Sequence, residues 1–122
     1  MGFNVSVRHT GTVAIIDLSG RVVLGESSIK MRDAIKGLPV GSSGNVLVNL
    51  KDVPYLDSSG LRELVTAYTS IKNAGGQLKL LHVQKVVKQL FEITRLNTVF
   101  ESFDDEAVAI QSFTSRTLQA GG

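Results

Sequence analysis

The sequence predicts a single α/β domain in which about four helices pack against one mixed sheet of about four to five strands. Two strand-like segments open the chain and are separated by a short turn. Strand-sized apolar runs and segments of helical spacing then alternate to the end of the chain, as expected for parallel strands joined by right-handed helical crossovers. A chain of 122 residues has room for one such domain and buries roughly two-thirds of its unfolded surface.

The opening segments are typical of a β-hairpin. Apolar residues alternate with polar ones from Phe3 to Val7, which indicates a strand with one buried face. Residues 9–12 form the expected turn. The following segment, Val13–Leu18, is apolar at nearly every position, so we expect it to be covered on both faces and to lie centrally in the sheet.

The middle of the chain predicts a helix, a strand and a second helix. Glu26–Leu38 has apolar residues at helical spacing, and a turn at Gly41–Gly44 leads into a strand at Val46–Leu50 near the sheet centre. The second helix is expected from about Ser59 to Asn73, starting directly beyond Ser58. Its apolar stripe should face the sheet and comprises Leu61, Leu64, Val65, Tyr68 and Ile71.

The last third of the chain predicts two further strands and two further helices. A strand at Leu78–Leu81 precedes a helix that carries Val86, Val87, Leu90 and Phe91. A short strand near Val99–Phe100 is followed by a helix with Ala107, Val108 and Ile110 on its apolar side. We expect one domain over residues 1–122, with a core from residue 3 to residue 113 and a flexible tail at 114–122.

The composition argues against several classes of function. The net charge is only +2 and aromatic residues make up 6% of the chain, so a basic stripe with stacking residues for nucleic acid is not expected. The absence of cysteine excludes a disulfide framework, a thiolate metal site and a cysteine nucleophile. No apolar run approaches the ~20 residues of a membrane span. We therefore expect a cytoplasmic protein without metal, cofactor, nucleic-acid partner or membrane partner.

One segment, Asp52–Leu61, combines chemistry with a favourable position. It joins a buried parallel strand to the helix beyond it, and binding sites in open α/β sheets gather at such strand ends. Asp57, Ser58 and Ser59 supply a carboxylate and two hydroxyls at a helix start, where free N–H groups stabilise anions. A phosphate on either serine would be favoured there. The same residues are also ordinary helix caps, and both interpretations remain open.

The segments around this motif resemble those of a known family. The block Val48–Leu50 followed by Leu56–Leu61 resembles the characteristic motif of STAS domains, named for sulfate transporters and anti-sigma-factor antagonists. It is most similar to the antagonists, in which Asp-Ser-(Ser/Thr)-Gly-(Leu/Ile) opens the helix after the third strand. Residues 71–80, 86–96 and 99–103 resemble later segments of the family. The resemblance covers residues 3 to 113 in order and implies a single STAS-type domain.

The resemblance implies a phosphorylation switch. Ser58 would accept phosphate from an anti-sigma factor that is also a serine kinase, with Ser59 as the second candidate, and a serine phosphatase would remove it. Asp57, Ser59, Gly60 and Leu61 would form the surroundings of the phosphate. Unphosphorylated, the protein would sequester the anti-sigma factor and so release a sigma factor. The expected partner-binding residues are Val23, Leu24, Gly25 and Glu26 in one loop and Arg62, Glu63 and Thr66 on the helix.

One departure and two alternatives accompany this expectation. Many family members carry an aspartate near the phosphorylation site where this chain has Val23. A second role within the same fold is a scaffold subunit, never phosphorylated, of a stressosome-like or transporter-associated complex. A hydrolase is disfavoured because the chain lacks a Gly-x-Ser-x-Gly motif and its two histidines, His9 and His82, lie in or beside strand segments. We expect a protein that is not an enzyme and has no catalytic residue.

Overall fold

The computed structural model describes residues 2–38 and 44–121, and gives the backbone alone for residues 114–121. The turn expected at Gly41–Gly44 therefore lies almost wholly outside the described residues. The chain forms one five-stranded sheet with strand order β1-β2-β3-β4-β5. Its strands are β1 (Asn4–Thr10), β2 (Val13–Ser19), β3 (Asn45–Asp52), β4 (Gln77–Leu81) and β5 (Ser102–Phe103). The opening hairpin is antiparallel and all later pairings are parallel, which confirms the mixed sheet.

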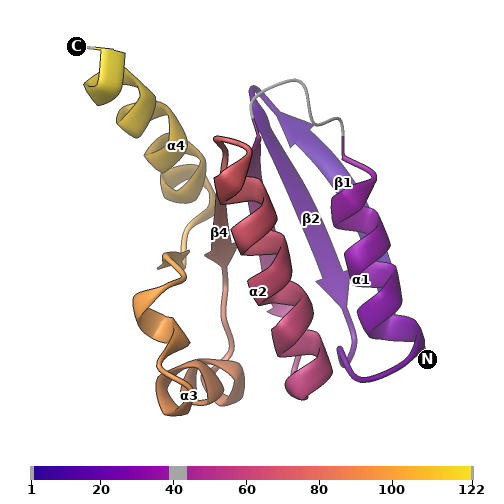
Figure 1. Cartoon of the computed structure of the whole chain (residues 1–122). Helices are drawn as coiled ribbons and strands as arrows, with labels where there is room; N and C mark the ends of the chain where they lie inside the picture. The colour runs from indigo at the N-terminus through magenta and orange to yellow at the C-terminus, as the bar shows by residue number, and fades with distance from the viewer. Residues whose placement is uncertain (1, 39–43, 122) are drawn as a thin grey trace.

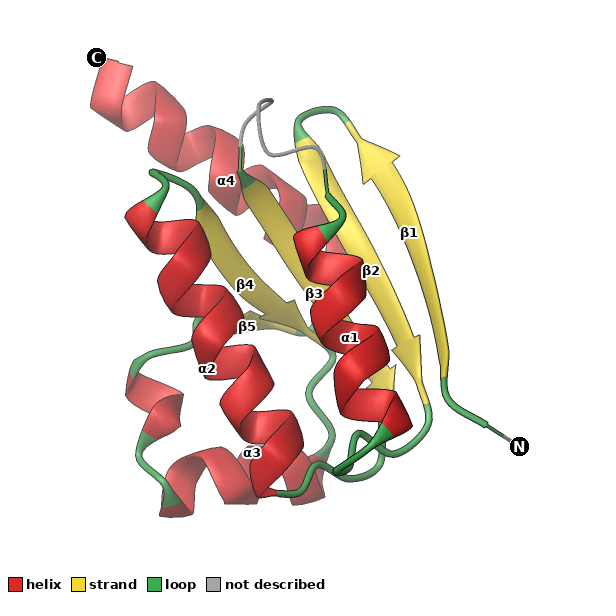
Figure 2. Ribbon diagram, turned by 45° about the vertical axis from the view of Figure 1, so that its right-hand side comes forward, coloured by secondary structure: helices red, strands yellow, loops and turns green. Residues whose placement is uncertain are grey.

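Helices cover both faces of this sheet (Figures 1 and 2). The helices α1 (Glu26–Lys36) and α2 (Ser58–Asn73) lie side by side on one face. The helix α4 (Glu106–Gly121) lies on the other face, and α3 (Lys85–Ile93) lies below the end of the sheet at which α2 begins. A 3-10 turn, η1 (Leu96–Thr98), connects α3 to β5. The α/β architecture with four helices is confirmed.

Alternating strand positions supply two hydrophobic cores. Ile16, Val48 and Leu80 face α1 and α2, where Leu64 is fully buried among them. The opposite face of the same strands forms a smaller core beneath α4. Because β2 and β3 feed both cores, they need apolar residues at nearly every position. Leu61, Val65 and Tyr68 pack against the larger core, so the predicted face of α2 is confirmed.

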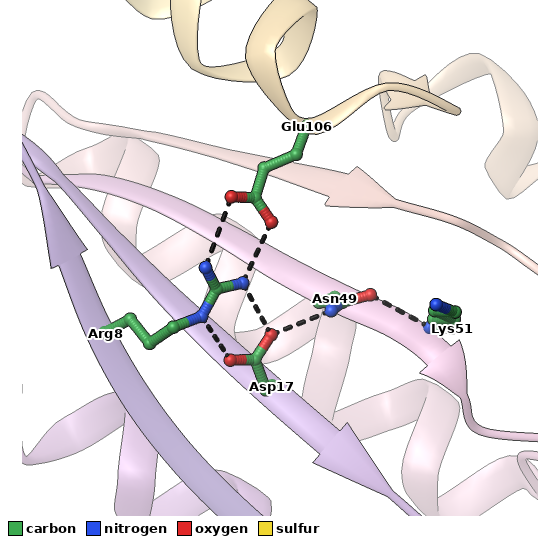
Figure 3. A network of polar contacts seen from close by, with 5 residues as sticks. All are labelled: Arg8, Asp17, Asn49, Lys51 and Glu106. Atoms are coloured by element: carbon green, nitrogen blue, oxygen red, sulfur yellow. Dashed lines mark hydrogen bonds and ion pairs between the residues drawn. The ribbon is translucent and has the colours of Figure 1, made fainter.

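A polar network holds the start of α4 against the first three strands (Figure 3). The Arg8 guanidinium donates to Asp17 at 2.6 Å and to Glu106 at 2.9 Å. Asn49 Nδ2 donates to Asp17 at 2.7 Å, and the Lys51 amide donates to Asn49 Oδ1 at 3.0 Å. The Arg8 guanidinium holds the pKa of Asp17 below its ordinary value. Residues nearly a hundred positions apart are thereby joined.

The last strand lies later than the apolar pair Val99–Phe100 predicts, although it falls within residues 99–103, the segment that resembles the family. Val99 and Phe100 follow the 3-10 turn, and Phe100 is a buried core residue whose ring stacks on Phe91 and meets Tyr68 edge-on. Pairing with β4 begins one residue later, where the Glu101 carbonyl accepts from Leu80, and β5 spans Ser102–Phe103. Val99 is exposed, whereas Phe100 is buried by neighbouring helices, and burial there selects the same apolar residue types as burial in a sheet.

The buried face of α4 also differs from the prediction. Ala109 and Phe113 are fully buried against the sheet, whereas Ala107 and Val108 are exposed. Ile110 packs at the edge of that core. The backbone of α4 continues to Gly121, and the flexibility expected for residues 114–122 stays a prediction. Within the described residues, no helix has both the length and the apolar character needed to cross a membrane.

Candidate functional site

Two loops meet at the carboxyl edge of the parallel strands, one after β2 and one after β3. The Val22 amide donates to the Tyr55 carbonyl at 3.0 Å, and the Val22 carbonyl accepts from the Asp57 amide at 3.1 Å. Val22 and Leu56 form an isolated parallel bridge, and both side chains are buried. Backbone pairing therefore continues past the regular strands and fixes the first loop against the start of α2.

Asp57 is the N-cap of α2 and connects it to the other loop. Its Oδ1 accepts from the amides of Ser59 at 2.9 Å and Gly60 at 3.0 Å. Its Oδ2 accepts from the Leu24 amide at 2.9 Å. These hydrogen bonds, led by that from Leu24, hold the pKa of Asp57 below its ordinary value. The capping interpretation of this motif is thus correct for Asp57, which leaves the two serines free of that task.

The charge on Asp57 should make stability depend on pH. A folded-state pKa below the unfolded one gives stability that is present above about pH 4 and is lost as the pH falls through the folded value. Asp57→Asn keeps an oxygen for the Ser59 and Gly60 amides but removes the charge. We expect this variant to unfold at lower urea concentration than wild type at pH 7, with the gap closing below about pH 4.

The control for this experiment is Asp104→Asn, which removes an exposed carboxylate beyond β5. It should leave the urea midpoint nearly unchanged at both pH values. An Asp57→Asn gap of equal size at pH 7 and pH 2 would show that the carboxylate charge contributes nothing.

Ser58 is the more accessible of the two serines. It is the first residue of α2 and is exposed, whereas Ser59 is half-buried. In the described part of the chain, no hydrogen bond involves the Ser58 hydroxyl. Two amides of the first turn, which we expected to be free for a phosphate, already bind Asp57 Oδ1. A phosphate on Ser58 would thus add charge at the surface beside Asp57.

Gly60 is required by packing. A Cβ at this position would lie 2.5 Å from the Val22 carbonyl oxygen and 2.9 Å from Val22 Cγ1. Gly60 itself is buried, so the first turn of α2 rests directly on the backbone of the other loop. Gly60 was expected among the surroundings of a phosphate, and its close neighbour in the structure is Val22.

The loop after β2 approaches the site through its backbone. Val23, where the aspartate was expected, has its amide and carbonyl bonded to the buried Ser27 hydroxyl at 2.8 and 3.0 Å. The Leu24 side chain is 78% exposed beside the amide that Asp57 holds. Glu26 lies 3.7 Å from Lys30 on its own helix. The loop therefore has a half-buried valine at the position where the resemblance leads one to expect a carboxylate, and it exposes the apolar Leu24 next to it.

An apolar groove of about 350 Å³ lies beside Ser58, between the start of α2 and α3. Its walls include Tyr55, Leu61, Val86, Leu90 and Ile93. Val86 is 56% exposed and Ile93 is 79% exposed. No functional role was expected for α3. Only Val87 and Phe91 are buried on α3, yet the helix carries further apolar residues. Apolar residues beyond those needed for the core are the sequence signal that could have indicated a binding surface on this helix.

The three α2 residues expected to bind the partner differ in position. Arg62 is exposed. Glu63 and Thr66 line a separate cavity between α1 and α2, and Glu63 lies 3.7 Å from Arg32 on α1. Their part in partner binding stays a prediction.

The two histidines of the chain lie away from the groove. Neither His9 nor His82 lines it, and the described residues contain no cluster of acidic or histidine side chains suited to a metal. Ser58 thus has no histidine base beside it in this arrangement.

Comparison with known proteins assigns the family. The sequence model described as the STAS domain matches residues 4–109, and the chain belongs to this family. The anti-sigma-B factor antagonist of Bacillus subtilis is 28% identical over 102 residues, which cover 83% of this chain and 91% of that protein. The anti-sigma F factor antagonist of Paenibacillus polymyxa is 24% identical over 110 residues, which cover 90% of this chain and 94% of that protein. These relatives are named as regulatory antagonists rather than as enzymes.

Solved structures share the fold. An anti-sigma factor antagonist described as putative, from Thermotoga maritima, superposes with a TM-score of 0.80 at 19% identity, covering 90% of this chain and 94% of its own. The Bacillus protein SpoIIAA has been solved unphosphorylated and phosphorylated, each with a TM-score of 0.69. The unphosphorylated form is 17% identical, and the match covers 89% of this chain and 96% of that one. The phosphorylated form is 16% identical, and the match covers 89% of this chain and 99% of that one.

Proposed function

We propose that this protein is an anti-sigma factor antagonist whose binding surface is switched by phosphorylation of Ser58. The observation that carries the proposal is the exposed Ser58 hydroxyl, which does not cap α2 and lies at the edge of an apolar groove. The names of the curated relatives supply the partner, an anti-sigma factor. In this proposal the partner is also the serine kinase, and a serine phosphatase restores the hydroxyl.

The geometry supports a binding surface in two parts. Leu24 and Tyr55 project from the two joined loops, and Val86 and Ile93 project from α3, all with substantial exposure. Ser58 lies at the groove between Tyr55 and α3. Covering an exposed apolar patch of this kind with a partner protein is favourable because it removes apolar surface from water. The unphosphorylated hydroxyl is neutral and small, so it permits close contact at the centre of the patch.

Phosphorylation changes this surface electrostatically. A phosphoserine carries about −1.5 to −2 charge at pH 7. Since Asp57 already occupies two of the first-turn amides, those of Ser59 and Gly60, the phosphate would be an additional anion beside an ionised carboxylate. Burying it under a partner would require desolvation without the two amide donors that could have stabilised it. The expected result is release of the anti-sigma factor with no change of fold.

Binding should depend on the α3 wall of the groove. Ile93→Lys places a charge where an apolar contact is expected, and burial of an isoleucine is worth about 1.5–3 kcal/mol. We therefore expect the affinity for the cognate anti-sigma factor to fall roughly tenfold or more. Isothermal titration calorimetry with the purified partner measures this change.

Val108→Lys is the matched control because Val108 is also exposed but lies on α4, on the opposite face of the sheet. It should bind as wild type does. Equal affinities for the two variants would exclude α3 from the interface. A wild-type protein that binds no anti-sigma factor would instead favour the scaffold role.

A further inference from the structure

A second and larger cavity, of about 690 Å³, lies at the other end of the α1–α2 pair. Its floor is the amino-terminal edge of the sheet, at Ala14 and Val46, and its walls are the later turns of both helices. In Figure 2 this is the end of α2 remote from α3 and hence from Ser58. The cavity has no place in the proposed switch.

The cavity exists because small side chains lie between α1, α2 and the sheet, where large side chains usually pack together. Thr66, Ala67 and Ser70 face it from α2, and Ala14 faces it from β2. Ile35 and Ile71 make its walls apolar. Sites for small organic ligands typically occupy about 300–1,000 Å³ and combine an apolar lining with a few polar groups. This cavity falls within that range.

The charged groups at the cavity are mainly cationic. Among the described residues that line it, Arg32 and Lys36 are cationic and Glu63 is the one carboxylate. Arg32 lies 3.7 Å from Glu63 and is partly neutralised by it. The ion pairs of α1 in the described chain involve Lys30 and Arg32, and none of them involves Lys36. The Lys36 ammonium is therefore available to an anionic group at the mouth of an apolar space.

We propose that this cavity binds a small amphipathic anion, with an aliphatic body between α1 and α2 and a carboxylate paired with Lys36. The small side chains supply the space, the apolar walls supply the affinity for an aliphatic body, and the excess of cationic groups selects the charge of the head. This ligand site does not involve Ser58, although Glu63 and Thr66 in its lining are also expected partner-binding residues.

The test compares decanoate, below its micelle concentration, with uncharged 1-decanol. The readout is the methyl spectrum of isotopically labelled protein. Decanoate should shift the methyl signals of Ile35, Val46 and Ile71 and bind more tightly than 1-decanol. Lys36→Gln should weaken decanoate binding roughly fivefold, the effect of losing one exposed charge pair, without affecting 1-decanol.

Two further variants complete the design. Lys30→Gln removes the same charge from the same helix outside the cavity and should leave decanoate binding unchanged. Ser70→Leu fills the cavity from a solvent-accessible position and should abolish binding of both probes. The proposal is overturned if decanoate leaves the three methyl signals in place, or if 1-decanol binds equally well. Equal losses in Lys36→Gln and Lys30→Gln would likewise exclude the pairing with Lys36.

Discussion

Ser58→Asp is expected to lower the affinity for the anti-sigma factor by roughly tenfold or more, while Ser58→Ala binds as wild type does. The aspartate adds a second carboxylate next to Asp57, whose own oxygens already hold the nearby amides. Like charges and desolvation then oppose contact at the centre of the apolar patch. Phosphate carries more charge than aspartate, so phosphorylation itself should weaken binding further.

The same variants test the acceptor. Incubation with the partner kinase and ATP, followed by mass spectrometry, should place phosphate on Ser58 in wild type and nowhere in Ser58→Ala. Since Asp57 caps α2, the stability of Ser58→Ala should stay within about 0.5 kcal/mol of wild type. Phosphate on Ser59, or unchanged binding by Ser58→Asp, would refute the assignment of the switch.

Gly60→Ala should destabilise the protein, although alanine normally favours a helix over glycine by about 1 kcal/mol. The added Cβ would lie 2.5 Å from the Val22 carbonyl oxygen, and both Val22 and Gly60 are buried. Backbone cannot turn away as a flexible side chain can, so the loop after β2 must shift. Overpacking of this kind costs about 1–3 kcal/mol or more. Because the close contact is with backbone, we expect a cost at the upper end of this range, and after the gain in helix propensity a net loss of about 2 kcal/mol.

Thermal unfolding measures this loss as a fall in Tm of roughly 5–10 °C. Gly2→Ala is the control, because nothing lies within 4 Å of a Cβ built at Gly2. Its Tm should remain that of wild type. A Gly60→Ala protein with wild-type Tm would mean that the two loops are not held together as tightly as their hydrogen bonds indicate.

Local pattern was sufficient for most of the fold. The nearly continuous apolar run of β2 and the stripe at Leu61, Leu64 and Tyr68 each depend on neighbours in sequence and were predicted correctly. The period-two run before the first turn is a strand as predicted, but Val7 on its apolar face is exposed. The place of the strand after η1 was not predicted from the apolar pattern. Val99 and Phe100 have residue types that suit a strand, but the rings of Tyr68 and Phe91 hold Phe100 in the helical layer. Such contacts between distant segments leave no local pattern.

The features of the candidate site likewise fall into those that the sequence predicts and those that only the tertiary structure decides. The sequence by itself determined the fold class, the family and the place of Ser58 at the start of α2, since these depend on short motifs and their spacing. Only the tertiary structure decided that Asp57 occupies the first-turn amides and also holds Leu24, and that Gly60 rests on Val22. It also decided that α3 supplies the second wall of the groove. Parallel strands joined by crossovers bring their ends together from distant parts of the chain, so these contacts arise only when the sheet has formed.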